Sequence, residues 1–150
     1  MFLRLLFTLL LSVGSAYGAS VEDRAISETA QRTNYTVSEV RETLKSCDRD
    51  ERSLSLCAEH SFVLEDEKLK ERYRDQLARV RGSSFEKPFI SAQQAWVRFR
   101  DLDCEYEASG VEGGSMHGQW VLNCKRERTI ERIRNMDAFL NCTDNGCPSN

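Results

Sequence analysis

Six cysteines constrain the fold of this 150-residue chain more than any other feature. An even number of cysteines in a short chain made for an oxidising compartment is typical of a disulfide framework. Six cysteines allow 15 connectivities, and the sequence alone does not choose among them. We favour three local bridges between cysteines that are neighbours along the chain. These are Cys47 with Cys57, Cys104 with Cys124, and Cys142 with Cys147.

The first 18 residues are typical of a secretory signal. Arg4 supplies a positive start, residues 5–13 form a short apolar run, and small residues precede a cleavage site before Ala19. The run is too short to span a bilayer, and no cysteine stands at the cleavage site to carry a lipid. We therefore expect export to the periplasm or the medium, with no stable membrane anchor.

Removal of 18 from 150 residues leaves 132, a length suited to a single domain over residues 19–150. The signal contains one basic residue and no acidic one, so the mature chain keeps 20 basic and 24 acidic residues and a net charge near −4. This balance disfavours non-specific binding to nucleic acid and favours a cationic protein as partner.

Helical signals dominate, and no run of alternating strand residues is present. A short polar segment over 20–33 comes first. The run Thr36-Val37-Ser38-Glu39 is a capping box that predicts a second helix to about Ser46, burying Val37, Val40 and Leu44. A long third helix is predicted from Asp50 to Arg81 by one apolar stripe at helical spacing, and Gly82-Ser83-Ser84 ends it. The stripe comprises Leu54, Ala58, Phe62, Leu69, Tyr73, Leu77 and Val80.

Two further helices are predicted around a glycine-rich break at 108–114. Pro88 is placed as the first residue of the fourth helix, and Ser115 as the cap of the last. The predicted inward residues of the fourth helix are Phe89, Ala92, Trp96, Phe99, Leu102 and Tyr106. Those of the last are Met116, Trp120, Cys124, Ile130, Ile133 and Phe139, and a coil tail follows from about 141. The expected fold is all-α, a small disulfide-stabilised bundle of three longer helices plus a short N-terminal helix.

The glycine-rich break is the candidate binding site. Five acids and no base lie between Asp101 and Ser115, and Glu107 and Glu112 flank the loop. An acidic glycine-rich tip can enter the cleft of a cationic glycan hydrolase and pair with arginines at its rim. The alternative is a solvated turn whose glycines adopt positive φ. The candidate binding residues are Glu107, Ser109, Glu112, Gly113, Gly114 and Ser115.

The surrounding residues resemble the signature of the lysozyme-inhibitor LprI-type N-terminal domain family. The resemblance rests on Ala92, Gln93, Ala95, Trp96, Arg100, Asp101, Cys104, Gly113, Gly114, Ser115 and Cys124. Cys57-Ala58 with Asp66, Leu69 and Tyr73 resembles its first half, so the likeness covers about residues 47–134. It implies a small exported helical domain that binds and inhibits lysozyme. Cys142 and Cys147 lie beyond the signature.

The sequence gives little support for a catalytic or a metal-binding function. Two carboxylates on one tight loop do not form the two walls of a glycosidase cleft. No Cys-x-x-Cys or EF-hand spacing is present, so we expect no metal and no cofactor.

His60 and His117 are interpreted as surface residues. Arg100-Asp101 is interpreted either as a functional ion pair or as an inter-helix contact. The basic run over 125–134 is interpreted as a solvated helix face with internal pairs. Besides a lysozyme inhibitor, an envelope adaptor that packs against another exported protein remains open.

Overall fold

The computed structural model describes residues 18–144 and 146–148, and this part of the chain is helical throughout its regular elements. The helices are α1 (Val21–Thr33), α2 (Val37–Thr43), α3 (Glu51–Val80), α4 (Glu86–Glu107) and α5 (His117–Asn141). A short 3-10 segment, η1 (Ala108–Val111), follows α4. The predicted all-α bundle is confirmed, with two short helices before the three long ones. Of the predicted signal, only Gly18 lies among the described residues.

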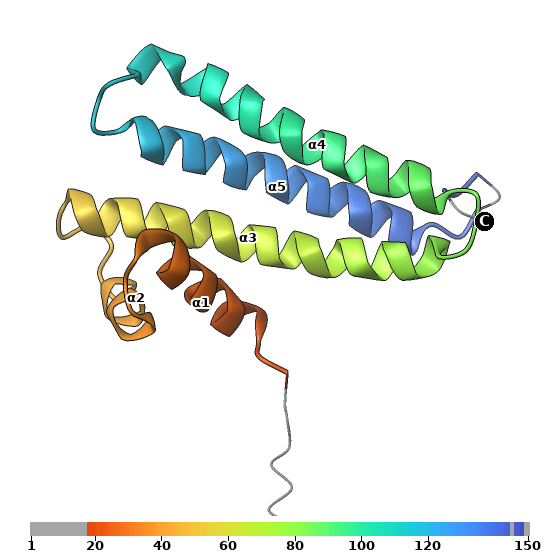
Figure 1. Ribbon diagram of the computed structural model, residues 1–150, viewed down its shortest axis with the longest axis horizontal. Coiled ribbons are helices and arrows are strands. Elements are labelled where there is room, and N and C mark those ends of the chain that lie inside the picture. The colour runs from red at the N-terminus through yellow and green to blue at the C-terminus, as the bar shows by residue number, and fades with distance from the viewer. Residues whose placement is uncertain (1–17, 145, 149–150) are drawn as a thin grey trace, which may run out of the picture.

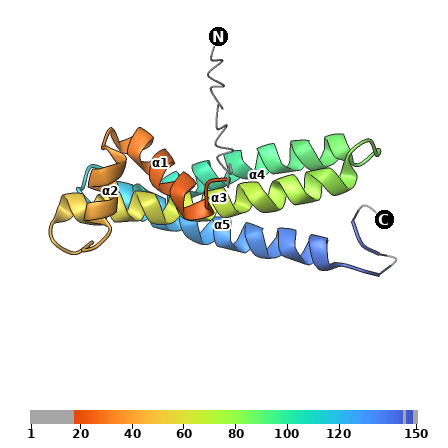
Figure 2. The same cartoon turned by 90° about the horizontal axis from the view of Figure 1, so that it is seen from below.

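Helix α5 lies against both α3 and α4, whereas α3 and α4 contact each other over a smaller area. Helices α1 and α2 pack on the N-terminal half of α3, away from α4 (Figure 1). A view turned by 90° shows α1 and α2 on the opposite side of α3 from α5 (Figure 2). The α4–α5 turn therefore lies at one end of the bundle, and the turn between α3 and α4 lies at the other.

Local sequence signals account for most helix ends. Thr36 and Glu39 form the predicted capping box of α2, with the Glu39 backbone N–H donating to the Thr36 hydroxyl at 3.2 Å. Asp50 and Ser53 form a similar reciprocal cap on α3. Gly82 takes a φ of 75° directly after α3, a conformation that glycine adopts without steric cost. These ends agree with the predicted bounds to within a few residues.

Two predicted helix starts are wrong. Helix α4 begins at Glu86, so Pro88 is its third residue rather than its first. This position is compatible with proline, because the N–H groups of the first turn have no partner within the helix. Helix α5 begins at His117 after Met116, without a side-chain cap, so Ser115 does not cap it.

All six cysteines form the three local bridges that the sequence favoured. Cys47–Cys57 closes the turn between α2 and α3, Cys104–Cys124 links α4 to α5, and Cys142–Cys147 closes the segment after α5. The apolar core between them is divided into small clusters. One contains Ile26, Ala30, Val40 and Leu56, another Ala25, Phe62 and Val63, and a third Cys104, Ala108 and Val121.

Candidate functional site

The turn between α4 and α5, which we name the tip, comprises residues 107–116 and projects at one end of the bundle (Figure 1). Backbone hydrogen bonds close it in steps, from Glu112 N to Ser109 O at 3.2 Å and from Gly114 N to Val111 O at 3.1 Å. Gly113 has a φ of 76°, which explains a glycine at this position. The tip is thus a sequence of tight turns with a defined backbone.

The structure brings the six candidate binding residues together on this tip. Glu107, Ser109, Glu112, Gly113, Gly114 and Ser115 are all exposed. Ala108 is buried beneath them, in the same cluster as the Cys104–Cys124 bridge. The bridge joins the two helices that carry the tip, so the tip has a covalent support directly below it.

Cations of α5 neutralise part of the acidic run. Arg128 pairs with Glu107 and, at 3.2 Å, with Asp103. The charge of Glu107 is the main reason why the pKa of Arg128 is raised above its usual value. Lys125 lies 3.8 Å from Asp101 and 3.9 Å from a Glu105 carboxylate oxygen.

These ion pairs between α4 and α5 differ from those predicted from the sequence. The basic run of α5 was expected to pair within its own helix, as Arg126 with Glu127 and Arg128 with Glu131 do. Its main partners Asp103 and Glu107 instead belong to α4. Among the described residues Glu112 makes no ion pair within 4 Å, so its carboxylate is the one on the tip open to a partner.

The pair Arg100-Asp101 is part of an inter-helix contact. Arg100 is 5% exposed, and its guanidinium donates to Asp101 at 3.0 Å, to Asp66 of α3 at 2.9 Å and to Thr129 of α5 at 3.1 Å. Its charge also lies over the ring of Phe62, 5.0 Å from the centroid. One side chain of α4 thereby joins all three long helices.

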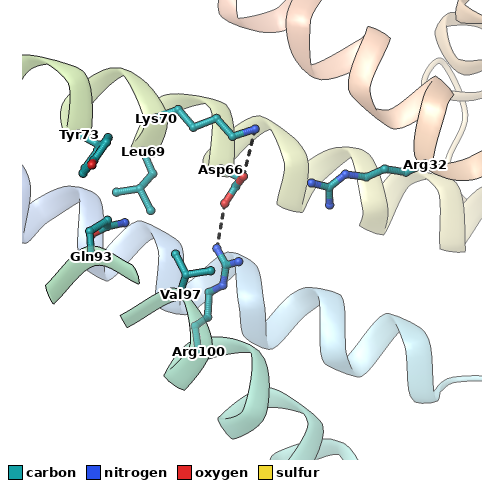
Figure 3. A pocket seen from close by; sticks show the side chains of 8 residues that line it. All are labelled: Arg32, Asp66, Leu69, Lys70, Tyr73, Gln93, Val97 and Arg100. Carbon is teal, nitrogen blue, oxygen red and sulfur yellow. Dashed lines mark hydrogen bonds and ion pairs between the residues drawn. The ribbon is translucent and has the colours of Figure 1, made fainter. Parts of the chain in front are cut away.

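A cavity of about 390 Å³ opens beside Arg100 between α3 and α4 (Figure 3). Its lining comprises Arg32, Asp66, Leu69, Lys70, Tyr73, Gln93, Val97 and Arg100. Asp66 is the one carboxylate in this lining, and it is already bound by Arg100 and lies 3.4 Å from Lys70. The lining therefore lacks the second carboxylate that glycoside hydrolysis uses. Across the described residues, no group of three or more His, Cys, Asp or Glu side chains is arranged to hold a metal.

The interpretation of His60 as a surface residue is wrong. Its ring is buried between α1 and α3, with Nε2 3.2 Å from Glu22 and Nδ1 3.4 Å from the Thr29 hydroxyl. His117 is partly exposed at the start of α5, 3.9 Å from Glu105.

Several predicted core residues face solvent instead. On α4 these are Ala92, Phe99, Leu102 and Tyr106. Met116 of the tip, Trp120 of α5, Val37 of α2 and Leu54 of α3 are exposed as well. The buried line of α4 runs through Gln93, Arg100 and Cys104. Cys104 was the signal in the sequence for the buried side of α4, because a bridge to α5 requires the side of α4 that carries Cys104 to face α5.

Trp120 borders a hollow of about 390 Å³ beside the tip. Glu107, Ala108, Asn123, Cys124 and Glu127 complete its lining. The surface around the tip thus combines exposed aromatic residues with carboxylates. None of the helices in the described part of the chain is both long and apolar enough to cross a membrane.

A helical hairpin closed by a disulfide bridge and packed on a third long helix, with an exposed acidic tip, defines a small disulfide-linked class of all-α proteins. The family model described as "Lysozyme inhibitor LprI" matches residues 45–136, which is more than half of the chain, and the protein belongs to this family. The resemblance noted in the sequence is therefore confirmed.

One similar protein is an uncharacterized protein of Rhizobium meliloti (strain 1021). It is 27% identical over 104 residues, which cover 61% of this chain and 75% of the relative. No solved structure matches the chain. The family match includes α3, α4 and α5 up to residue 136, and it leaves α1 and α2 outside it.

Proposed function

We propose that this protein is an exported, non-enzymatic inhibitor of lysozyme or of a related murein hydrolase. The observation that carries the proposal is the family match over residues 45–136, which contains the whole tip and the bridge beneath it. The three disulfides suit an oxidising compartment, and we place the protein in the periplasm or the medium. It uses no cofactor or metal, and neither nucleic acid nor membrane is its partner.

The tip is the proposed contact with the enzyme. Glu112 presents a carboxylate without an ion pair among the described residues, and Glu107 presents one that it shares with Arg128. Ser109, Gly113, Gly114 and Ser115 form a narrow backbone with little side-chain bulk. A cationic hydrolase would be attracted by these carboxylates, and the tip would then block access of the glycan to the cleft. Because the bridge and the turn bonds already order the tip, binding loses little conformational entropy.

Lysis of cell walls by purified c-type lysozyme, with and without the oxidised mature protein, tests this function. We expect lysis to slow as the protein is added up to micromolar concentration. Unchanged lysis over that range would overturn the proposal for this enzyme.

The variant Glu112→Gln tests the tip itself. We expect slower association with lysozyme at low salt and a weaker salt dependence, because an exposed charge at the rim of an interface acts mainly on the encounter rate. Asp75→Asn is the matched control, since it removes an exposed charge of α3 that lies away from the tip. Equal association rates for both variants would exclude Glu112 as a contact.

An envelope adaptor is the second candidate, and the exposed apolar residues of α4 are the observation that favours it. Affinity capture from envelope extract at low and high salt separates the two functions. Recovery of a murein hydrolase supports inhibition, and recovery of another exported protein that resists high salt supports the adaptor.

A further inference from the structure

The outer face of α4 carries a row of large apolar side chains that the fold leaves in solvent. Phe99, Leu102 and Tyr106 are 58%, 62% and 79% exposed. Their spacing of three and four places them on one side of the helix, opposite Cys104, which is fully buried against α5. We call these three residues the α4 ridge.

The α4 ridge adds almost nothing to the packing of the bundle. Aromatic side chains offer about 150–250 Å² each for burial, and contiguous exposed apolar areas of several hundred Å² mark interaction sites on soluble proteins. Aromatic anchors of this kind also dominate the binding energy of protein interfaces. The ridge thus has the composition of an interface core without a partner inside the chain.

The charge along the ridge indicates the chemistry of that partner. Asp103 and Glu107 follow Phe99 by four and eight residues and form one edge, and Asp101 and Glu105 lie toward the other. Arg98 lies beside the ridge, and Lys125 and Arg128 of α5 pair with these four carboxylates. Glu112 of the tip adds a carboxylate that makes no ion pair among the described residues, so this end of the hairpin keeps an excess of negative charge. A positively charged protein complements that excess, with its apolar surface on the ridge.

The edge formed by Asp103 and Glu107 runs along α4 toward the tip. Glu107 lines the hollow next to Trp120, which is 54% exposed on α5, together with Glu127. Glu107 therefore lies at the end of α4 that carries the tip, between the ridge and the hollow beside Trp120. A target bound at the tip is close to both.

We propose that the α4 ridge is the apolar part of the docking surface for a positively charged target protein. The inference rests on the proposed function, which makes that target lysozyme. The acidic edges and the tip attract the target, and burial of Phe99, Leu102 and Tyr106 then slows its release.

The triple variant Phe99→Gln, Leu102→Gln and Tyr106→Gln tests this proposal. Glutamine keeps helix propensity, and the replaced side chains are exposed, so circular dichroism and the melting temperature should stay close to those of the wild type. Leu54→Gln is the control, because Leu54 is a similarly exposed apolar residue on α3. Affinity for purified c-type lysozyme is measured at low and at high salt.

We expect at least a tenfold loss of affinity for the triple variant at both salt concentrations and no loss for the control. Loss at both concentrations identifies an apolar contribution, whereas the Glu112→Gln effect should fade as salt rises. Wild-type binding with an unchanged triple variant would overturn the ridge proposal and leave the proposed function standing. A wild-type protein that neither binds nor inhibits lysozyme would overturn both. A dimeric wild type together with a monomeric triple variant would overturn the proposal and assign the ridge to self-association instead.

Discussion

Helix α1 and the α4–α5 hairpin both complete the bundle around α3, but they are attached by different kinds of interaction. Helix α1 has no disulfide. It packs Ala25, Ile26 and Ala30 into the apolar clusters with α3, and its Arg24 binds Glu67 at 2.9 Å and Glu71 at 2.6 Å. The hairpin is closed by Cys104–Cys124 and anchored by buried Arg100. The tip is therefore supported by a covalent bond, whereas α1 is attached by non-covalent contacts that include ion pairs weakened by acid and salt.

The family match follows the same division. It covers the hairpin and α3 but not α1 or α2. Helices α1 and α2 thus lie against α3 but outside the matched part of the chain. Four measurements test this difference between α1 and the hairpin.

Replacing Arg100 with alanine should give the largest effect. The change leaves Asp66, whose side chain is 15% exposed, without its main partner at the junction of three helices. We expect a loss of about 3–5 kcal/mol in the free energy of unfolding, measured by urea denaturation. Arg98→Ala, on the exposed side of the same helix, should change it by less than about 0.5 kcal/mol. Equal effects of the two variants would show that Arg100 is not the anchor of α4.

The double variant Cys104→Ser and Cys124→Ser should come next. The bridge spans a sequence separation of 20 residues, and its removal should cost roughly 3 kcal/mol in the chain-entropy model. Cys142→Ser with Cys147→Ser opens a separation of only 5 residues and should cost roughly 2 kcal/mol. Chemical denaturation of both variants measures the difference. A tip that keeps full affinity without the Cys104–Cys124 bridge would contradict its role as support.

Acidification should release α1 before the hairpin. Burial alone would raise the pKa of Glu67, but hydrogen bonds from Lys70 and Arg24 outweigh it and lower the pKa. The pKa of Asp23 is lowered as well, first by a hydrogen bond from Ser20 and then by Arg41. A carboxylate with a lowered folded pKa stabilises the fold above its unfolded value near 4, and this contribution is lost as the pH falls through the folded value.

Hydrogen exchange of α1 between pH 7 and pH 3 measures this release. Glu67→Gln should cost about 1–2 kcal/mol at pH 7 and flatten the pH dependence, because it removes the acceptor of two cations. Glu86→Gln, on α4, serves as the control. Simultaneous release of α1 and α4 would mean that the two attachments are coupled.

The smallest effect is expected at the cap of α2. Thr36→Ala removes the hydroxyl that accepts from the Glu39 N–H, and it should cost about 1 kcal/mol in thermal unfolding. Ser38→Ala, in the first turn of the same helix and with no capping bond, is the control. No change for Thr36→Ala would indicate that α2 is ordered by the Cys47–Cys57 bridge alone.

The features that depend on neighbouring residues could be predicted from the sequence. The α2 cap, the end of α3 at Gly82 and the pairing of adjacent cysteines each need only a few residues of context. The exposure of the tip residues was also correct, because glycines and carboxylates favour a turn in solvent.

The side of α4 that faces the bundle could not be predicted in the same way, because apolar residues occur on both sides of this helix. Its inward side is chosen by Arg100, whose partners Asp66 and Thr129 are 34 and 29 residues away. The ion pairs of Arg128 with α4 were missed for the same reason, since acids of its own helix stood closer in sequence. Hydrophobicity alone predicts Phe99, Leu102 and Tyr106 in the core, whereas they are exposed in the structure.

The order of the disulfides has a consequence for biogenesis. Each bridge joins consecutive cysteines, at separations of 10, 20 and 5 residues. Under the proposed export, the polypeptide would emerge N-terminus first from a translocation pore, and both cysteines of each bridge would emerge before the first cysteine of the next bridge. An oxidase that couples thiols in order of emergence would therefore produce the native set without reshuffling, so maturation should need little help from a disulfide isomerase.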